Sequence, residues 1–359
     1  MANYCGAAYL EAAMRAVLAQ TERRLELIVA DDASDDRSVS IARAVAADDR
    51  RVRVIAGARN RGPGATRNLA LDAARGDWVA VVDSDDLIHP ERLARLIAAA
   101  EAAGADLVAD DLVYFGNPAE QGRTLLQHLA LTAPMTLATA TYLRANGGDP
   151  AVPSFGYLKP VIRRMVLGDR RYDPRLRIGE DYDLVLRLLI EGARFLLLPD
   201  PLYAYRRHPG SVSHRLSVDT VQAMLAAHRN LPDIDDPVTR AAAAAVDLQL
   251  CRALRYERLV ADIKARRWTR ALPRLADPAM IARLAESLRD RRRRKATGSK
   301  DNQSSAPLGP LPELPSPDQA WDRAPASLAG RIVATGALPS NAPDWAVWLA
   351  QATAEVSPG

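Results

Sequence analysis

Short apolar runs alternate with helix-like stretches through residues 1–110, and this alternation admits few folds. The expected strands are 25–30, 52–56, 77–82 and 105–110. The expected helices are 7–20, 38–47 and two more that begin at Pro63 and Pro90. Apolar residues at helical spacing and prolines in the first turn support these helices. Strands and helices that alternate at this interval form βαβ units, so we expect a doubly wound, mostly parallel α/β sheet with helices on both faces.

Acidic clusters follow two of these strands. "DDASDD" begins with Asp31 and Asp32, and "DSDD" contains Asp83, Asp85 and Asp86. The carboxyl ends of parallel strands meet at one edge of a sheet, so the two clusters should converge there. Carboxylates this close repel one another unless a cation lies between them, and Mg²⁺ or Mn²⁺ prefers such oxygen ligands. The alternative is that Asp85 or Asp86 caps the next helix.

A basic, glycine-bearing loop, "GARNRGPG", lies between the two clusters. Gly62 and Gly64 allow a ligand to approach the backbone closely, and Arg67 could bind a phosphate through two hydrogen bonds. The alternative places Arg67 on a solvated helix face. The loop lacks the Lys-Ser/Thr ending of a P-loop, and no G-x-G-x-x-G follows a strand, which argues against a nicotinamide-binding domain.

Composition limits the class of protein. The 359 residues are 48% hydrophobic and 26% charged, which suits a soluble globular protein. A net charge of +4 favours phosphates or an anionic surface over nucleic acid as partners. Cys5 and Cys251 form neither a metal-binding spacing nor a disulfide framework. Because there is no apolar run of about 20 residues and no signal-peptide pattern, we expect a cytoplasmic protein that meets a membrane only at its inner face.

Three stretches together resemble the family 2 glycosyltransferases, which have the GT-A fold. They are "LELIVADDASDD", "NRGPGATRNLALDAARGDWVAVVDSDDLIHPERL" and "GEDYDLVLRLL". The resemblance implies a GT-A domain over residues 1–215, with a nucleotide-sugar half at 1–111 and an acceptor and catalytic half at 112–215. "MANYCGAAYLEAAM", "GYLKP" and "YRRHPGSVSHR" resemble, more narrowly, the succinoglycan-type enzymes of exopolysaccharide biosynthesis.

In this family a nucleotide-diphosphate sugar lies across the strand ends. The resemblance implies that Asp32 contacts the nucleobase, that Asp83 lies near the ribose and that Asp85 holds the Mn²⁺ or Mg²⁺ that bridges the diphosphate. Tyr4 falls at the family's tyrosine position and becomes a candidate nucleotide contact. A cation is needed at such a site because the leaving nucleoside diphosphate develops negative charge.

The second half of the domain carries the candidate catalytic residues. Glu180 and Asp181 begin an amphipathic helix, where the helix dipole stabilises carboxylates, and the plain alternative is N-terminal capping. The resemblance implies a general base here, which takes the proton of the acceptor hydroxyl in a single, inverting displacement. We expect Asp181 to be this base, with Glu180 and Asp183 in support. Tyr157 and Lys159 are candidates for the acceptor site, although Lys159 could equally be a surface residue.

A cationic loop follows the last strand of the resembled region. The resemblance implies that Arg206 and Arg207 close over the diphosphate and that His208 completes the ligand shell of the cation. A lone histidine is more often structural, and this alternative stays open. His214 and Arg215 are further candidates for phosphate contact, with less support.

The start of the chain departs from the family pattern. In the family an apolar first strand precedes the tyrosine, whereas here Met1 falls where that strand should be ending. We therefore expect nearly the whole first strand to be missing from an otherwise central position in the sheet. Two explanations stay open: a start assigned too far downstream, or a truncated and weakened enzyme.

The C-terminal part divides by composition into three segments. Residues 216–289 are rich in Ala and Arg and predict a helical extension. Residues 290–326 predict a disordered linker, basic at first and then rich in Pro and Ser, and 327–359 predict a short helical segment. The run "RDRRRRK" is either a solvated linker or a polybasic patch that binds anionic lipid.

Together these features predict a metal-dependent inverting transferase. We expect it to move a hexose, with glucose as the first choice, from a UDP-sugar to a lipid-linked oligosaccharide or polysaccharide acceptor. A sugar nucleotidyltransferase is one alternative, but it would begin with a basic glycine-rich loop that this chain lacks. A non-catalytic sugar-nucleotide-binding subunit is the other, and the intact "DSDD" and "GED" motifs argue against it.

Overall fold

The computed structural model describes residues 1–116, 123–147, 149, 152–208, 216–278, 280–285, 287, 289 and 348. The strands are β1 (Ala2–Asn3), β2 (Leu27–Asp31), β3 (Val52–Ala56), β4 (Trp78–Ala80), β5 (Leu87–Ile88), β6 (Leu107–Ala109), β7 (Leu112–Phe115), β8 (Met135–Leu137), β9 (Val161–Arg163), β10 (Phe195–Leu197) and β11 (Tyr203–Arg206). The helices are α1 (Leu10–Leu18), α2 (Ser38–Asp48), α3 (Pro63–Ala73), α4 (Arg92–Ala103), α5 (Thr139–Asn146), α6 (Arg164–Leu167), α7 (Glu180–Ile190), α8 (Val218–Arg229), α9 (Pro237–Lys264) and α10 (Trp268–Arg274). Two short 3₁₀ helices, η1 (Gln127–Leu129) and η2 (Phe155–Tyr157), complete this part of the chain.

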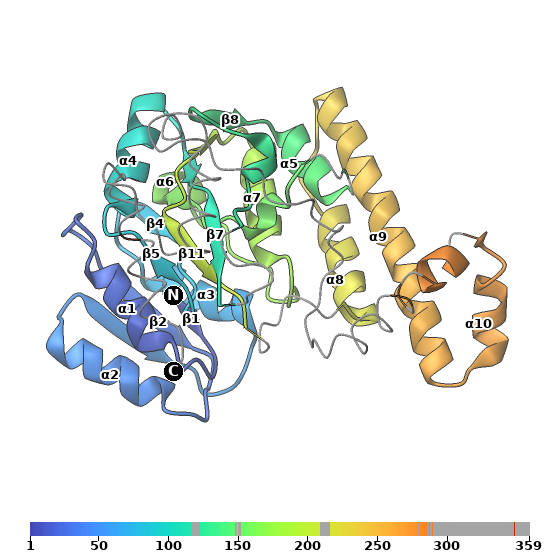
Figure 1. Cartoon of the computed structure of the whole chain (residues 1–359), viewed down its shortest axis with the longest axis horizontal. Helices are drawn as coiled ribbons and strands as arrows, with labels where there is room; N and C mark the ends of the chain where they lie inside the picture. The colour runs from blue at the N-terminus through green and yellow to red at the C-terminus, as the bar shows by residue number, and fades with distance from the viewer. Residues whose placement is uncertain are drawn as a thin grey trace, which may run out of the picture.

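The strands form an α/β domain with helices around it, as predicted (Figure 1). Strands β1, β2 and β3 pair in parallel, in that order. The second sheet has the order β4-β9-β6-β10-β8 and the third the order β5-β11-β7, and each contains one parallel pair. The antiparallel pairs all include a strand from the second half of the domain, where the local pattern gave little signal.

The first strand is short but present. Ala2 and Asn3 pair with Ala30 and Asp31 of β2, so two residues remain of the strand that we expected to be nearly absent. Asn3 strengthens this pairing, because its Nδ2 donates a 2.8 Å hydrogen bond to the carboxylate of Asp31. The pairing leads the chain out at the carboxyl end of the sheet, where Tyr4 follows.

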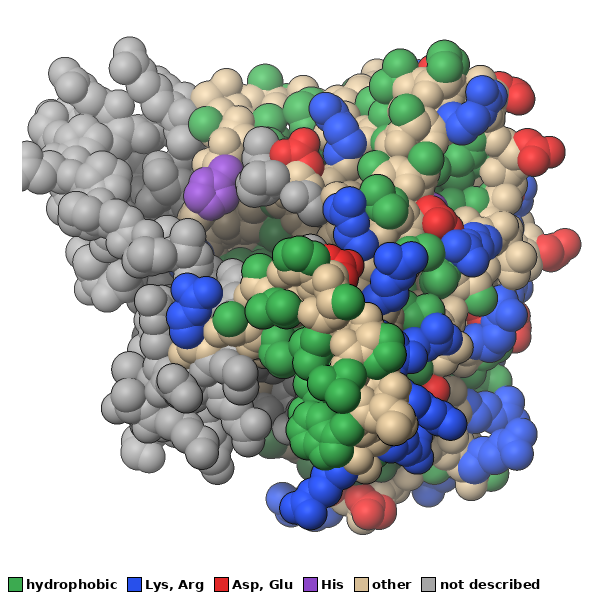
Figure 2. Space-filling view, turned by 90° about the vertical axis from the view of Figure 1, so that its right-hand side faces the viewer, with side chains coloured by type: hydrophobic (Ala, Val, Ile, Leu, Met, Phe, Trp, Pro, Cys, Tyr) green, Lys and Arg blue, Asp and Glu red, His purple; other side chains and the backbone are tan. Residues whose placement is uncertain are grey.

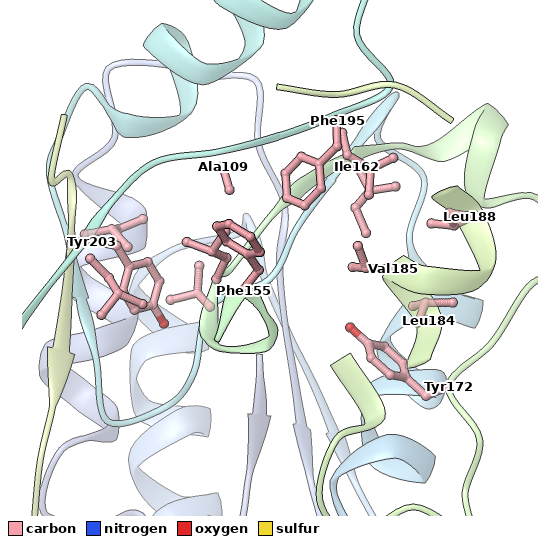
Figure 3. Packing of buried hydrophobic residues seen from close by; sticks show 14 of the residues in the cluster. Ala109, Phe155, Ile162, Tyr172, Leu184, Val185, Leu188, Phe195 and Tyr203 are labelled. Carbon is pink, nitrogen blue, oxygen red and sulfur yellow. The ribbon is translucent and has the colours of Figure 1, made fainter. Parts of the chain in front are cut away.

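One part of the hydrophobic core lies between the sheet and α7. Figure 3 shows Leu184, Val185 and Leu188 of α7 turned toward Ile162 and Phe195 of the sheet. All five side chains are buried. This packing fixes the axis of α7, and it therefore fixes the position of the acidic residues in the first turn of the helix.

The predicted helical extension is made of α8, α9 and α10, and α9 also packs along α5 of the α/β domain. Ser217 caps α8 by accepting from Thr220 N–H, and Asp236 caps α9 by accepting from Thr239 N–H. The predicted linker at 290–326, the segment 327–359 apart from Trp348, and the basic run beyond Arg289 lie outside the described residues. None of the described helices combines the length and apolar composition that a membrane crossing requires.

A buried carboxylate between β6 and β7 makes the stability of the fold depend on pH. Asp111 is fully buried, and its Oδ1 accepts from Leu112 N–H at 2.8 Å and from Leu126 N–H at 2.9 Å. Burial raises its pKa to about 7. The folded protein therefore binds a proton that the unfolded chain has lost, and stability falls as pH rises from about 4 to about 7.

We expect Asp111→Asn to remove this pH dependence, since Asn Oδ1 can accept the same two hydrogen bonds. The free energy of unfolding of the variant relative to wild type should increase by about 1.4 kcal/mol per pH unit between about pH 4 and 7, and level off above. Urea titrations at several pH values measure the difference. A difference that does not change with pH would show that Asp111 is ionised throughout.

Candidate active site

One cavity of about 1170 Å³ lies at the carboxyl ends of β1 and β2 and at the first turns of α3 and α7. Most of the predicted site residues line it: Tyr4, Asp32, Arg67, Asp83, Asp85, Glu180, Asp181 and His208. They come from six separate stretches of the chain, so the fold brings together residues that are far apart in the sequence. Arg206 and Arg207 are not among the described residues that line the cavity.

Asp32 and Tyr4 form one end of the cavity. The Asp32 carboxylate accepts from Arg61 N–H at 2.7 Å and from Gly62 N–H at 2.8 Å, so it holds the basic loop against the sheet. Gly62 has φ of 90°, a conformation that favours glycine, and a Cβ there would lie 2.9 Å from the Arg177 side chain. Tyr4 is 57% exposed and leaves a face open to a flat ligand.

Five charged side chains meet at the centre of the cavity. Arg67 donates to Glu180 at 2.5 Å and to Asp83 at 2.8 Å, and lies 3.5 Å from Asp181 Oδ1. Lys159 Nζ lies 2.7 Å from Asp83 and 3.1 Å from Asp181 Oδ2. Two cations thus hold three carboxylates, and the ion pairs connect the end of β4 with the start of α7.

The pKa values of this cluster reflect competition between burial and charge. Burial opposes ionisation of Asp83, but Lys159 and Arg67 outweigh it and hold the pKa of Asp83 well below its usual range. Burial also opposes the charged forms of Lys159 and Arg67, yet their carboxylate partners raise both pKa values well above normal. Glu180 differs, because burial dominates and raises its pKa in spite of Arg67.

The "DSDD" motif divides into two parts. Asp85 points into the cavity, with its Oδ2 3.0 Å from His208 Nε2. Asp86 is buried, and it accepts from the Tyr203 hydroxyl and from Arg206 N–H, each at 2.7 Å. Burial, together with Asp85 and Asp83, raises the pKa of Asp86 well above its usual range. Asp86 is thus a structural anchor of the loop, and Asp85 is the member that can meet a ligand.

Asp85 and His208 fit a divalent cation. Asp85 Oδ2 and His208 Nε2 are 3.0 Å apart, close enough for both to bind one ion, and both side chains keep some solvent exposure. In the described part of the chain no group of three or more His, Cys, Asp or Glu side chains is arranged to hold a metal ion. Mg²⁺ and Mn²⁺ at phosphate sites commonly take one or two protein ligands and complete their shell with phosphate oxygens and water, so two ligands suffice.

Comparison with known proteins assigns the chain to a family. The model of glycosyl transferase family 2 matches residues 1–165. The succinoglycan biosynthesis protein ExoU of Rhizobium meliloti is 33% identical over 240 residues, which cover 64% of this chain and 69% of ExoU. The chain belongs to glycosyltransferase family 2. ExoO of the same organism, also named for succinoglycan biosynthesis, is 39% identical over 230 residues, which span 63% of this transferase and 65% of ExoO.

Solved structures with the same fold support the GT-A architecture of the transferase. TarS 1–349 of S. aureus, in complex with UDP-GlcNAc, superposes with a TM-score of 0.56 at 21% identity, over 69% of this chain and 70% of that one. The mannosyltransferase PcManGT of Pyrobaculum calidifontis, in complex with GDP-Man and Mn²⁺, gives 0.51 at 19% identity over 79% and 78%. At this identity the likeness concerns the fold alone.

Arg206 and Arg207 of the transferase lie behind the cavity instead of over it. Both are only 5% exposed. Arg206 donates through Nε to the backbone carbonyl of Asp85 at 2.7 Å, and its guanidinium lies against the rings of Tyr9 and Phe115. Arg207 lies against the rings of Tyr114, Tyr157 and Tyr205. Arg206 thus supports the loop that carries Asp85, and contact with a diphosphate remains a prediction for both arginines.

Lys159 has a larger part in the transferase site than its sequence context indicates. The sequence left it as an acceptor-site candidate or a surface residue, whereas the structure buries it at the centre of the ion pairs, 6% exposed. The only local signal is a lysine inside the apolar run "YLKPVI". Tyr157 lines the cavity as expected, and Asp183 is paired with Arg187 one helical turn later.

Proposed function

We propose that this protein is a divalent-cation-dependent, inverting glycosyltransferase that moves a hexose from a UDP-sugar to a lipid-linked oligosaccharide or polysaccharide acceptor. The observation that carries the proposal is that one cavity holds both a cation-ligand pair, Asp85 and His208, and a carboxylate at a helix start, Asp181. The names of ExoO and ExoU support exopolysaccharide biosynthesis as the process. We propose that it acts in the cytoplasm, at the inner face of the plasma membrane.

The donor would lie along the cavity from Tyr4 to Asp85. The nucleobase would lie between the exposed Tyr4 ring and Asp32, and the ribose would come near Asp83. The UDP-GlcNAc and GDP-Man complexes of TarS and PcManGT, and the Mn²⁺ of the latter, support a cation-bound nucleotide sugar as the donor class. Asp85 and His208 would hold Mn²⁺ or Mg²⁺, which when bound supplies the positive charge that the leaving diphosphate requires.

Asp181 is the proposed base. Its Oδ1 makes no hydrogen bond to a described residue and lies 3.5 Å from Arg67, while Lys159 holds Oδ2. The acceptor hydroxyl would give its proton to Oδ1 as its oxygen bonds to the anomeric carbon. The bond from that carbon to the diphosphate oxygen breaks, and UDP leaves with the electron pair. Because attack and departure take place on opposite faces, the configuration inverts.

We expect Mn²⁺-dependent binding of a UDP-sugar that requires Asp85. Calorimetric titration of UDP-glucose with and without Mn²⁺ measures it, and Asp85→Ala should weaken binding by at least about tenfold because one of two protein ligands is lost. Asp49→Ala, outside the cavity and 25% exposed in its side chain, is the matched control. If no UDP-sugar binds the wild type, the proposed donor class is wrong, and binding without turnover on any acceptor would favour a non-catalytic subunit.

A further inference from the structure

The cavity continues past Asp181, away from the donor end, between α7 and the helical extension. On the extension side it is lined by Val221, Met224 and Ala227 of α8 and by Val246, Leu250 and Ala253 of α9. We call these six residues the apolar wall. Gly179, the residue before Glu180, lies beside the wall, since a Cβ added at Gly179 would be 3.6 Å from the Met224 methyl. The wall therefore begins at the catalytic end of the cavity.

The chemistry of the wall is aliphatic. No aromatic side chain from the described parts of α8 and α9 lines this part of the cavity. Sugar rings are usually held by aromatic faces and several polar groups, whereas an alkyl or isoprenoid chain needs only apolar contact. Polar groups on this side are few: His228 Nε2 donates to the Ala243 backbone carbonyl at 2.9 Å, and Gln249 Oε1 is buried without a hydrogen-bond partner among the described residues.

The far end of the cavity lies near an exposed apolar surface. Arg283 lines that end and stacks over Tyr256 of α9. On α10, which packs against α9, Trp268 and Leu272 are more than half exposed. Figure 2 shows apolar side chains gathered on this face, with Lys and Arg side chains beside them. Exposed tryptophan with arginine is typical of a surface that meets lipid head groups, which is where a lipid-linked acceptor would arrive.

We propose that the apolar wall binds the aliphatic chain of a lipid-linked acceptor and so presents the acceptor hydroxyl to Asp181. The inference rests on the proposed function and deepens it, because it selects the lipid-linked class of acceptor. It also gives the helical extension a role in the site: α8 and α9 form the acceptor side, while the α/β domain forms the donor side.

Chain-length dependence tests the proposal with simple probes. Methyl, hexyl and octyl β-D-glucoside carry the same neutral sugar, so they avoid competition for a diphosphate site. Calorimetry below the micelle-forming concentration should give an affinity for octyl glucoside at least about 20-fold higher than for methyl glucoside, because several methylenes are buried. Equal affinity for the three glucosides would overturn the proposal.

Two variant pairs locate the binding. Ala253→Phe fills the cavity, and Ala245→Phe makes the same change on the exposed face of α9. Met224→Gln makes the wall polar, and Leu248→Gln makes a comparable change at a position that is 51% exposed and outside the cavity. We expect the wall variants to lower the ratio of octyl to methyl affinity to below about 3 and the controls to keep it, with thermal melting as the check on folding.

The outcomes separate this inference from the proposed function. Loss of chain-length dependence equally in a wall variant and its control would place the binding elsewhere and overturn the inference, whatever the result with UDP-glucose. If UDP-glucose binds and the glucosides show no chain-length dependence, the function stands and the wall proposal fails. If the wall variants remove a strong chain-length dependence but no UDP-sugar binds, the wall stands and the donor assignment fails.

Discussion

Asp181→Asn is expected to lower kcat for sugar transfer by about 10³-fold while leaving the Kd for the UDP-sugar within about threefold. Asparagine has the shape of aspartate, and its Oδ1 can still accept from Lys159, which now lies 3.1 Å from Oδ2. The variant cannot take up the acceptor proton, because an amide is not a base at neutral pH. Single-turnover transfer measures the rate, and calorimetry with UDP-glucose measures donor binding.

Glu180→Gln is the matched variant for this experiment. It lies next to Asp181, is similarly buried and also pairs with Arg67. We expect its effect on kcat to be at least about tenfold smaller, because Arg67 already holds the Glu180 carboxylate through a hydrogen bond of 2.5 Å. A larger loss in Glu180→Gln than in Asp181→Asn would assign the base to Glu180, whose pKa burial raises. Equal loss of donor binding in both would refute the division of roles.

Lys159→Met should give the second large effect. The substitution removes an ammonium shared by Asp83 and Asp181 and leaves both carboxylates in a buried place with only Arg67. Breaking a buried pair by removing one partner commonly costs about 3–5 kcal/mol, so we expect a loss of this size in the free energy of unfolding at pH 7, together with a strong loss of transfer. Urea titration and steady-state transfer measure the two effects.

The dependence on pH identifies the role of Lys159. Lys159 and Arg67 hold the pKa of Asp83 well below its usual range, so in wild type this carboxylate stays ionised, and its contribution to stability is lost only as pH falls below the unfolded value of about 4. In Lys159→Met that contribution should shrink, and the acid limb of donor binding should move to higher pH. Lys159→Arg should restore the profile in part, and Lys264→Met, an exposed lysine of α9, should change nothing. An unchanged profile in Lys159→Met would show that Lys159 does not set the ionisation of Asp83.

The sequence predicted the convergence of the acidic residues after the first strands better than the rest of the site, because each of these residues lies close to a strand in the sequence. Asp32 directly follows β2, and Asp83 and Asp85 lie in the loop that follows β4, so their place after these strands brings them to one edge. Arg206 and Arg207 were expected over the diphosphate because the resemblance to the family implies it. In the structure the Arg206 guanidinium lies against the ring of Phe115, which is distant in the sequence, and the Arg207 guanidinium also lies against aromatic rings.

Other features depend on contacts between residues that are far apart in the sequence, and no local pattern predicts such contacts. Residues 112–158 give little periodic signal, because β7 and β8 are only four and three residues long and pair with β11 and β10, which come much later in the chain. Lys159 reads as a surface lysine until Asp83 and Asp181 are placed on either side of it. The sequence also does not predict the apolar wall. The pattern of α8 and α9 is that of ordinary amphipathic helices, and only the fold shows that one face of each lines the cavity.

The order of strands in the sheets determines whether the α/β domain can be divided into separately folding fragments. Strand β9 lies between β4 and β6, and β11 pairs with β5 as well as with β7, so strands from the second half of the domain pair with strands from the first half. A gene fragment for residues 1–111 would expose unpaired strand edges where β9 and β11 now lie, and the later fragment would hold Lys159 and Asp181 without Asp83. The nucleotide-sugar half and the catalytic half are therefore functional descriptions of one interwoven folding unit, and they cannot be exchanged between relatives as separate modules.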